Sequence, residues 1–217
     1  MPRIFKTTFS SIGKTPAMRF GANYRFLYDI CGLDLFKSSK YPRIKLYKLL
    51  IKKNYAKLPK GELISRKRII DLNDVSQGTR LLLSERFVTS IDSDKWILDD
   101  SDISISKMEP ENGKAFVNAG SMNAIGSTEW IQLSLDKNVV LPEYLLFVLL
   151  TENVLSALAD LKFGKAQQRM SYDDFINIEI PLPGLTEQAM IIEEIKNRHK
   201  DYSKLILKVK KEDEIIA

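Results

Sequence analysis

Residues 163–195 read FGKAQQRMSYDDFINIEIPLPGLTEQAMIIEEI, and this segment carries the clearest structural signals in the chain. Gly164 and the polar residues after it predict a loop, and Ser171 is placed to begin a short helix. FINIEI predicts a strand, which the two prolines end. Thr186 is then placed to cap another helix, because its hydroxyl can accept a hydrogen bond from a free backbone N–H.

The residues after Thr186 predict a long amphipathic helix. Apolar residues, one tyrosine and the single histidine recur at alternating spacings of three and four, which is the seam of a coiled coil. About 30 helical residues would extend roughly 45 Å, which is too long for a small domain to cover easily. We therefore expect pairing with another helix, and the alternative is packing along the same domain. The predicted helix-pairing residues are Ile192, Ile195, His199, Tyr202, Ile206 and Val209.

The region before residue 163 predicts short strands followed by helices. Between residues 63 and 135, short apolar or β-branched runs alternate with Asn, Asp, Gly and Ser clusters, as is typical of strands and turns. After Pro142, EYLLFVLLTENVLSALADLKF is too long for one strand and is spaced like one or two buried helices. The expected fold class is α+β, with a mixed, β-rich domain followed by a long C-terminal helix of coiled-coil type.

The basic charge is concentrated at the front of the chain. The net charge is +5, yet residues 1–68 hold 17 lysines and arginines against three acidic residues, and the remainder carries −9. Such segregation favours a polyanionic partner, because cations that neutralise phosphates release condensed counterions. The alternative is a solvated basic face. Composition also changes near residue 40, which suggests a basic extension at 1–40, a domain at 41–184 and a helical segment at 185–217.

The sequence gives no support for catalysis or for a cofactor. One histidine and one cysteine cannot form a zinc cluster, and no glycine-rich phosphate loop is present. The acidic pairs Asp99/Asp100 and Asp173/Asp174 could hold Mg²⁺ in a nuclease, but solvated loop charges explain them better. No apolar run approaches the roughly 20 residues of a membrane span. We therefore expect a cytoplasmic protein that is not an enzyme, has no metal or cofactor and does not contact a membrane.

The order of signals in residues 163–195 resembles the closing signature of the DNA specificity subunits of type I restriction-modification systems. The closing signature of that family has a fixed order: a glycine loop, a basic residue, a short helix, an apolar strand, a proline pair and Glu-Gln. PLPGLTEQ matches the end of this order. Similarity continues more weakly upstream, in IIDLNDVSQG at 69–78, ILDDSDISISKM at 97–108, GKAFV at 113–117 and LPEYLLFVLL at 141–150.

This resemblance implies a target recognition domain and a spacer helix. Together they would bind double-stranded DNA sequence-specifically and direct a partner adenine methyltransferase subunit, with a restriction subunit, to a bipartite target. The usual subunit has two recognition domains and two spacer helices, whereas this chain resembles one half. It would then form a homodimer, pair with another half-subunit, or be a truncated copy. The alternative is a truncated recognition module that acts as an interaction partner or specificity donor without directing modification.

Two polar loops and one basic run are the predicted DNA-binding residues. Arginine and lysine pair with guanine, and asparagine and glutamine pair with adenine. The first loop, after Gly164, contributes Lys165, Gln167, Gln168 and Arg169, and the second contributes Lys107, Asn112, Lys114 and Asn123. The predicted phosphate contacts are Lys52, Lys53, Arg66, Lys67 and Arg68. An ordinary exposed surface is the alternative for each group.

Overall fold

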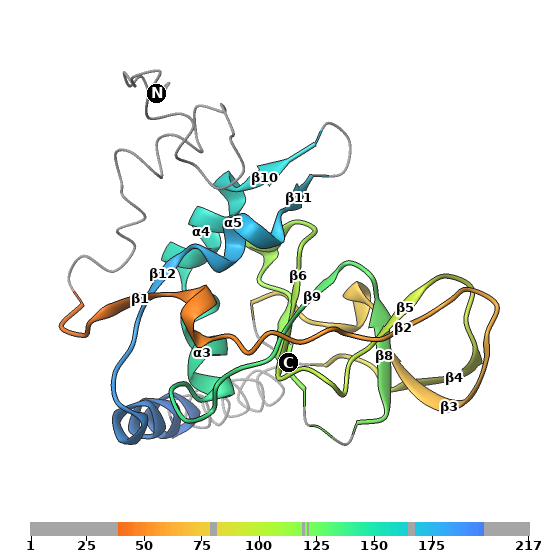
Figure 1. Ribbon diagram of the computed structural model, residues 1–217, viewed down its shortest axis with the longest axis horizontal. Helices are drawn as coiled ribbons and strands as arrows, with labels where there is room; N and C mark the ends of the chain where they lie inside the picture. Colours follow the sequence, from red (N-terminus) through yellow and green to blue (C-terminus); the bar gives the residue numbers. More distant parts are fainter. Residues whose placement is uncertain (1–38, 79–81, 119, 121, 165–167, 198–217) are drawn as a thin grey trace, which may run out of the picture.

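The computed structural model describes residues 39–78, 82–118, 120, 122–164 and 168–197. Within them, short strands and a few helices form a mixed α+β domain, as predicted (Figure 1). The helices gather at one end, and a five-stranded sheet forms the other end. The described residues contain no single helix long and apolar enough to cross a membrane; only α3 and α4 together, bent by 66°, reach that length and hydropathy.

The domain begins and ends in one antiparallel ladder. β1 (Arg43–Lys45) pairs with β12 (Glu179–Pro181), and Ile44 lies opposite Ile180. The 3-10 helix η2 (Leu46–Leu49) follows β1, and α5 (Tyr172–Ile176) precedes β12. These segments come from opposite ends of the domain and pack together. We call residues 43–49 and 172–181 the neck.

The predicted helical region after residue 142 forms two helices. α3 (Pro142–Leu149) and α4 (Glu152–Asp160) bury their apolar sides in the main core. A three-stranded antiparallel sheet in the order β7-β6-β9 packs into the same core. Its strands are β7 (Ala115–Val117), β6 (Ile103–Ser106) and β9 (Trp130–Leu133). A two-stranded ladder of β10 (Lys162–Phe163) and β11 (Arg169–Met170) extends beside them.

The five-stranded sheet has the order β2-β5-β8-β3-β4, and its only parallel pair is β3 with β8. Its strands are β2 (Lys57–Leu58), β3 (Leu63–Ile70), β4 (Arg86–Ser90), β5 (Lys95–Ile97) and β8 (Ala124–Ser127). β8 lies at the centre, where a Cβ on Gly126 would come within 2.6 Å of the backbone oxygen of Ile70. Glycine therefore permits the close approach of the two strands.

A buried network of charges fixes this sheet to the 3-10 helix η3 (Leu72–Asp74). Asp74 accepts hydrogen bonds from Arg86 and from the backbone N–H of Asp71. Lys95 is only 6% exposed, and its Nζ lies 3.1 Å from a carboxylate oxygen of Asp71. Because each buried charge has an opposite partner, the network avoids the large cost of an unpaired buried ion.

Two local expectations near the end of the domain are wrong. FINIEI forms a strand only from residue 179, because its first residues belong to α5. The Ser171 hydroxyl accepts a hydrogen bond from the backbone N–H of Asp174, so Ser171 caps the helix as predicted. The capped helix continues into the apolar run and includes Phe175 and Ile176. The next helix begins at residue 185, so Thr186 lies in its first turn and is not the cap.

The C-terminal helix is described over residues 185–197, and this part packs along its own domain. Ile192 is 7% exposed and belongs to the main core, and Ile195 is partly buried. Gln188 is fully buried, where its Oε1 accepts the N–H of Leu141 and its Nε2 donates to the backbone oxygens of Val139 and Pro183. The other predicted pairing residues, His199, Tyr202, Ile206 and Val209, lie outside the described residues, so helix pairing stays a prediction.

Candidate nucleic-acid interface

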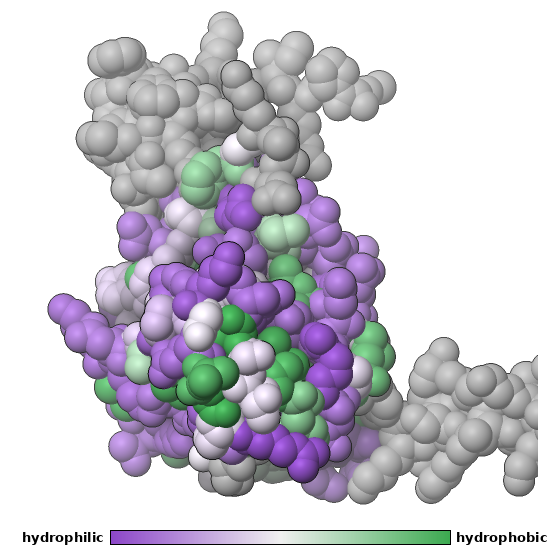
Figure 2. Space-filling model, turned by 90° about the vertical axis from the view of Figure 1, so that its right-hand side faces the viewer, coloured by the Kyte–Doolittle hydropathy of each residue, from purple (hydrophilic) through white to green (hydrophobic). Residues whose placement is uncertain are grey.

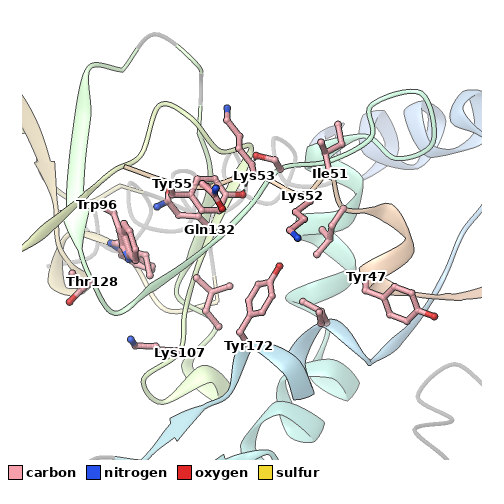
Figure 3. A pocket seen from close by; sticks show the side chains of 16 residues that line it. Tyr47, Ile51, Lys52, Lys53, Tyr55, Trp96, Lys107, Thr128, Gln132 and Tyr172 are labelled. Carbon is pink, nitrogen blue, oxygen red and sulfur yellow. Dashed lines mark hydrogen bonds between the residues drawn. The ribbon is translucent and has the colours of Figure 1, made fainter. Parts of the chain in front are cut away.

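A cleft of about 660 Å³ lies between the helical end of the domain and the five-stranded sheet (Figure 3). Its walls come from five parts of the sequence: residues 47–55, the strand β5, Lys107 after β6, the turn and strand at 128–134, and α5. The fold therefore brings together side chains that are far apart in the chain. Those with rings, amides, hydroxyls or positive charge are Tyr47, Lys52, Lys53, Asn54, Tyr55, Trp96, Lys107, Thr128, Trp130, Gln132, Ser134 and Tyr172.

Tyrosine rings line much of the cleft. Tyr47 and Tyr172 are 43% and 46% exposed, and the hydroxyl of the half-buried Tyr55 donates to Ser134 Oγ at 3.1 Å. Burial raises the pKa of Tyr55 and that of Tyr172, so both phenols stay protonated at neutral pH. Uncharged aromatic rings can stack on bases of any sequence and do not repel phosphates.

Three lysines line the same cleft and differ in their ion-pair partners. Lys53 donates to the backbone oxygen of Asp100 at 2.7 Å and lies 3.5 Å from its carboxylate. Lys107 lies 3.7 Å from Glu129. Lys52 is exposed and has no ion-pair partner among the described residues, so it is the cation most available to a phosphate.

Gln132 is a buried polar residue in the lining of the cleft. It lies on the face of β9 opposite Ile131 and Leu133, which belong to the main core. Its Oε1 accepts from Ser101 Oγ at 3.0 Å, whereas its Nε2 has no hydrogen-bond partner in the described part of the chain. Sequence reasoning missed this residue, because WIQLSL reads simply as a strand.

The structure brings the two predicted loops together beside the cleft. The backbone N–H of Met170 donates to the oxygen of Lys107 at 2.8 Å. Arg169 donates to Glu129 from Nε at 2.9 Å and from Nη2 at 3.0 Å, so Lys107 and Arg169 share one carboxylate. Gln168 is exposed, and Lys165 and Gln167 lie outside the described residues.

The other predicted base-reading residues make hydrogen bonds within the domain. Asn112 donates to Glu109, and Lys114 donates to the backbone oxygen of Leu72. Asn123 has a positive φ of 46° and accepts from the Nζ of Lys67 at 2.7 Å. These bonds give each side chain a structural role, and contact with bases stays a prediction.

The predicted phosphate contacts on β3 lie on the five-stranded sheet, away from the described cleft lining. Arg66 stacks over the ring of Phe87 at 4.4 Å, and Arg68 lies 3.5 Å from Glu85. Figure 2 shows apolar residues surrounded by hydrophilic ones at this end of the molecule. Leu63 and Phe87, which are 85% and 45% exposed, belong to the same pair of strands.

Three carboxylates of the two acidic pairs, those of Asp99, Asp100 and Asp174, have structural partners. Asp99 accepts the backbone N–H of Ala124, and Asp100 pairs with Lys53. Asp174 is fully buried and accepts from the hydroxyl of Ser171, so the expectation of a solvated loop charge is wrong there. The described residues contain no group of three or more His, Cys, Asp or Glu side chains able to hold a metal ion.

Replacing Glu129 with glutamine is expected to change the pH dependence of the unfolding free energy. Hydrogen bonds from Arg169 hold the pKa of Glu129 below its ordinary value of 4.5. A carboxylate with a lowered folded-state pKa contributes stability above its unfolded pKa, and that contribution is lost as the pH falls through the folded pKa. The difference in unfolding free energy between wild type and E129Q should therefore be largest near neutral pH.

Urea unfolding between about pH 3 and about pH 7 measures this difference. The control is Glu62→Gln, which removes an exposed carboxylate in the turn before β3, and its profile should run parallel to wild type. A parallel profile for E129Q as well would show that the pair of Glu129 with Arg169 contributes nothing measurable.

Solved structures of type I restriction-modification systems share this fold. The HsdS subunit from Thermoanaerobacter tengcongensis matches with a TM-score of 0.60 and 16% identity, over 76% of this chain and 43% of that chain. A chain from a structural study of complex assembly and conformational transition of the type I R-M system matches with a TM-score of 0.63 and 16% identity, over 82% of this chain and 48% of that chain. This chain thus spans less than half the length of either.

The family model described as type I restriction modification DNA specificity domain matches residues 34–215. The chain therefore belongs to this family, and the resemblance seen in the sequence is confirmed. No curated protein matches the sequence.

Proposed function

We propose that this chain is the DNA-recognition component of a type I restriction-modification system and binds double-stranded DNA at the cleft. Membership of the specificity-domain family supports the general role. The location is supported by one observation: aromatic rings, amides and lysines from five separate segments converge on one concave surface. Aromatic and cationic groups in one groove suit the bases and phosphates of nucleic acid.

In this proposal, affinity and sequence preference come from different side chains. Lys52 and Lys107 contact phosphates, which positions the DNA without reading its sequence. Amide side chains at the cleft, such as Asn54, contact base edges and supply the preference. The chain binds and orients the DNA, and a partner methyltransferase subunit performs the chemistry.

The proposed target is bipartite: the recognition domain described here would read one half-site, and a second recognition domain would read the other. Two copies that pair through the C-terminal helix would present two cleft surfaces related by a twofold axis, and the DNA half-sites would mirror that symmetry. Pairing with a different half-subunit would give an asymmetric bipartite target. The first turns of the helix are bound to the recognition domain through Gln188, so the helix would hold the domain at a fixed orientation.

The proposal is tested in two steps with the full chain. Fluorescence anisotropy with a labelled mixed-sequence duplex should show an affinity that falls linearly with salt concentration on logarithmic axes. Co-expression with a cognate methyltransferase subunit, followed by mapping of methylated adenines, should then give a bipartite motif. Absence of salt-sensitive duplex binding would contradict the DNA-binding role. A stable complex with the methyltransferase but no methylation would favour the interaction module instead.

A further inference from the structure

We infer that the cleft holds a single nucleotide that has left the base stack of the bound DNA. This inference rests on the proposed DNA-binding function and adds the form of DNA that occupies the site. The ligand chemistry is that of one nucleotide: a planar base with hydrogen-bonding edges, joined to a phosphate.

The cleft is shaped for a base that has left the stack. Paired bases in B-DNA are read by a helix, a strand or a long side chain that projects into a groove. Here the amide of Gln132 is recessed: this residue is only 4% exposed, whereas Tyr47 and Tyr172 are both more than 40% exposed. A convex duplex cannot place a paired base edge against a recessed amide. A nucleotide that rotates out of the stack can reach it.

Gln132 has a buried hydrogen-bond donor without an acceptor among the described residues. A buried amide N–H without a partner costs about 1–3 kcal/mol, and such groups are rare in folded proteins. The Nε2 of Gln132 is in this state, while its Oε1 is held by Ser101. Nε2 is closed to solvent in this structure, so a base that enters beside Gln132 would offer it the missing acceptor, a ring nitrogen or a carbonyl oxygen.

The remaining lining fits the rest of a nucleotide. Tyr55, Trp96 and Tyr172 provide ring surfaces around one volume, and Figure 3 shows Tyr172 rising from α5 toward Tyr55 and Lys52. The Nζ of Lys57 lies 4.9 Å from the centre of the Trp96 ring, which adds a cation beside that wall. A volume of about 660 Å³ lies in the usual range for sites that enclose a small organic ligand.

The experiment compares two labelled duplexes that differ by one unpaired 2-aminopurine nucleotide, which forms a bulge in the second duplex. The bulge removes the cost of unstacking, so the bulged duplex should bind at least about tenfold tighter than the paired one. The fluorescence of 2-aminopurine should also change when the protein binds, because its stacking partners change from bases to aromatic side chains. Free 2-aminopurine deoxyribonucleoside monophosphate is the third probe.

Two substitutions assign the effect to the cleft. Gln132→Leu should lower the ratio of bulged to paired affinity about tenfold, because it removes the donor to the base. The variant should fold, since leucine has a similar size and Ser101 still has the backbone oxygen of Leu98 as an acceptor; its urea midpoint checks this. The matched control is Gln77→Leu at an exposed position outside the cleft, which should keep the wild-type ratio. Tyr172→Ala should lower the ratio, and Tyr172→Phe should restore it through stacking.

The possible outcomes distinguish the flipped nucleotide from DNA binding itself. Equal affinity for bulged and paired duplexes, with unchanged 2-aminopurine fluorescence, would overturn the inference and leave the DNA-binding function standing. Absence of binding to either duplex would overturn both. Free nucleotide that binds as tightly as the bulged duplex would show that the cleft serves a small nucleotide ligand, and this result would also overturn the inference.

Discussion

The double variant Lys52→Glu with Lys107→Glu is expected to lower the affinity of the chain for duplex DNA by about two orders of magnitude in moderate salt. Each substitution removes a cation at the cleft and places a negative charge near the phosphates. Because each lost phosphate contact also reduces counterion release, the slope of log affinity against log salt should become shallower by about two. Fluorescence anisotropy across a salt series measures both quantities.

The matched control for this prediction is Lys196→Glu on the C-terminal helix. It reverses one charge outside the cleft lining and should change affinity by no more than about twofold to threefold through net charge alone. If the double variant binds as well as this control does, the DNA lies elsewhere. The exposed Arg66 and the neighbouring Lys67 on β3 would then be the next residues to test.

Phe175→Ala is expected to cost about 3–5 kcal/mol of unfolding free energy. Phe175 is fully buried in the main core. It belongs to α5, the helix of the neck that also carries Tyr172. Removing its ring leaves a cavity that the surrounding strands and helices cannot fill. Since domains of this kind have only about 5–15 kcal/mol of stability, the variant should lose much of it.

Urea denaturation followed by circular dichroism measures this loss. Phe163→Ala removes the same ring from a position that is 51% exposed and should change stability by about 0.5 kcal/mol or less. Comparable losses for the two variants would contradict the position of Phe175 in the core. DNA affinity of Phe175→Ala should fall only under conditions in which the variant unfolds.

Local signals in the sequence predicted those parts of the fold in which neighbouring residues decide the structure. The apolar spacing after Pro142 predicted buried helices, and Ser171 predicted a helix start. The extent of α5 was missed, because FINIEI has a strand-like composition and the cap at Ser171 overrides it. β8 lacks a local signal of its own. Its sequence AIGS has little strand character, and its position depends on pairing with β3, which is far away in the chain.

The candidate site was predicted only in part. Lys52 and Lys53 of the basic run line the cleft, and their contact with DNA stays a prediction. Arg169 looked like a base reader in the sequence, but its partner Glu129 is 40 residues away and no local pattern links them. Gln132 carried no signal at all, because its importance comes from burial without a hydrogen-bond partner. Such a property exists only after the chain has folded.

The neck also has a consequence for how sequence preference can change. β1 and β12 lie side by side, so the chain enters and leaves the domain at the same place (Figure 1). Under the proposed function, we expect that the segment between the two strands could be replaced as one block without a shift of the helix that follows. A new sequence preference would then come with the replaced segment, while the C-terminal helix would keep its position.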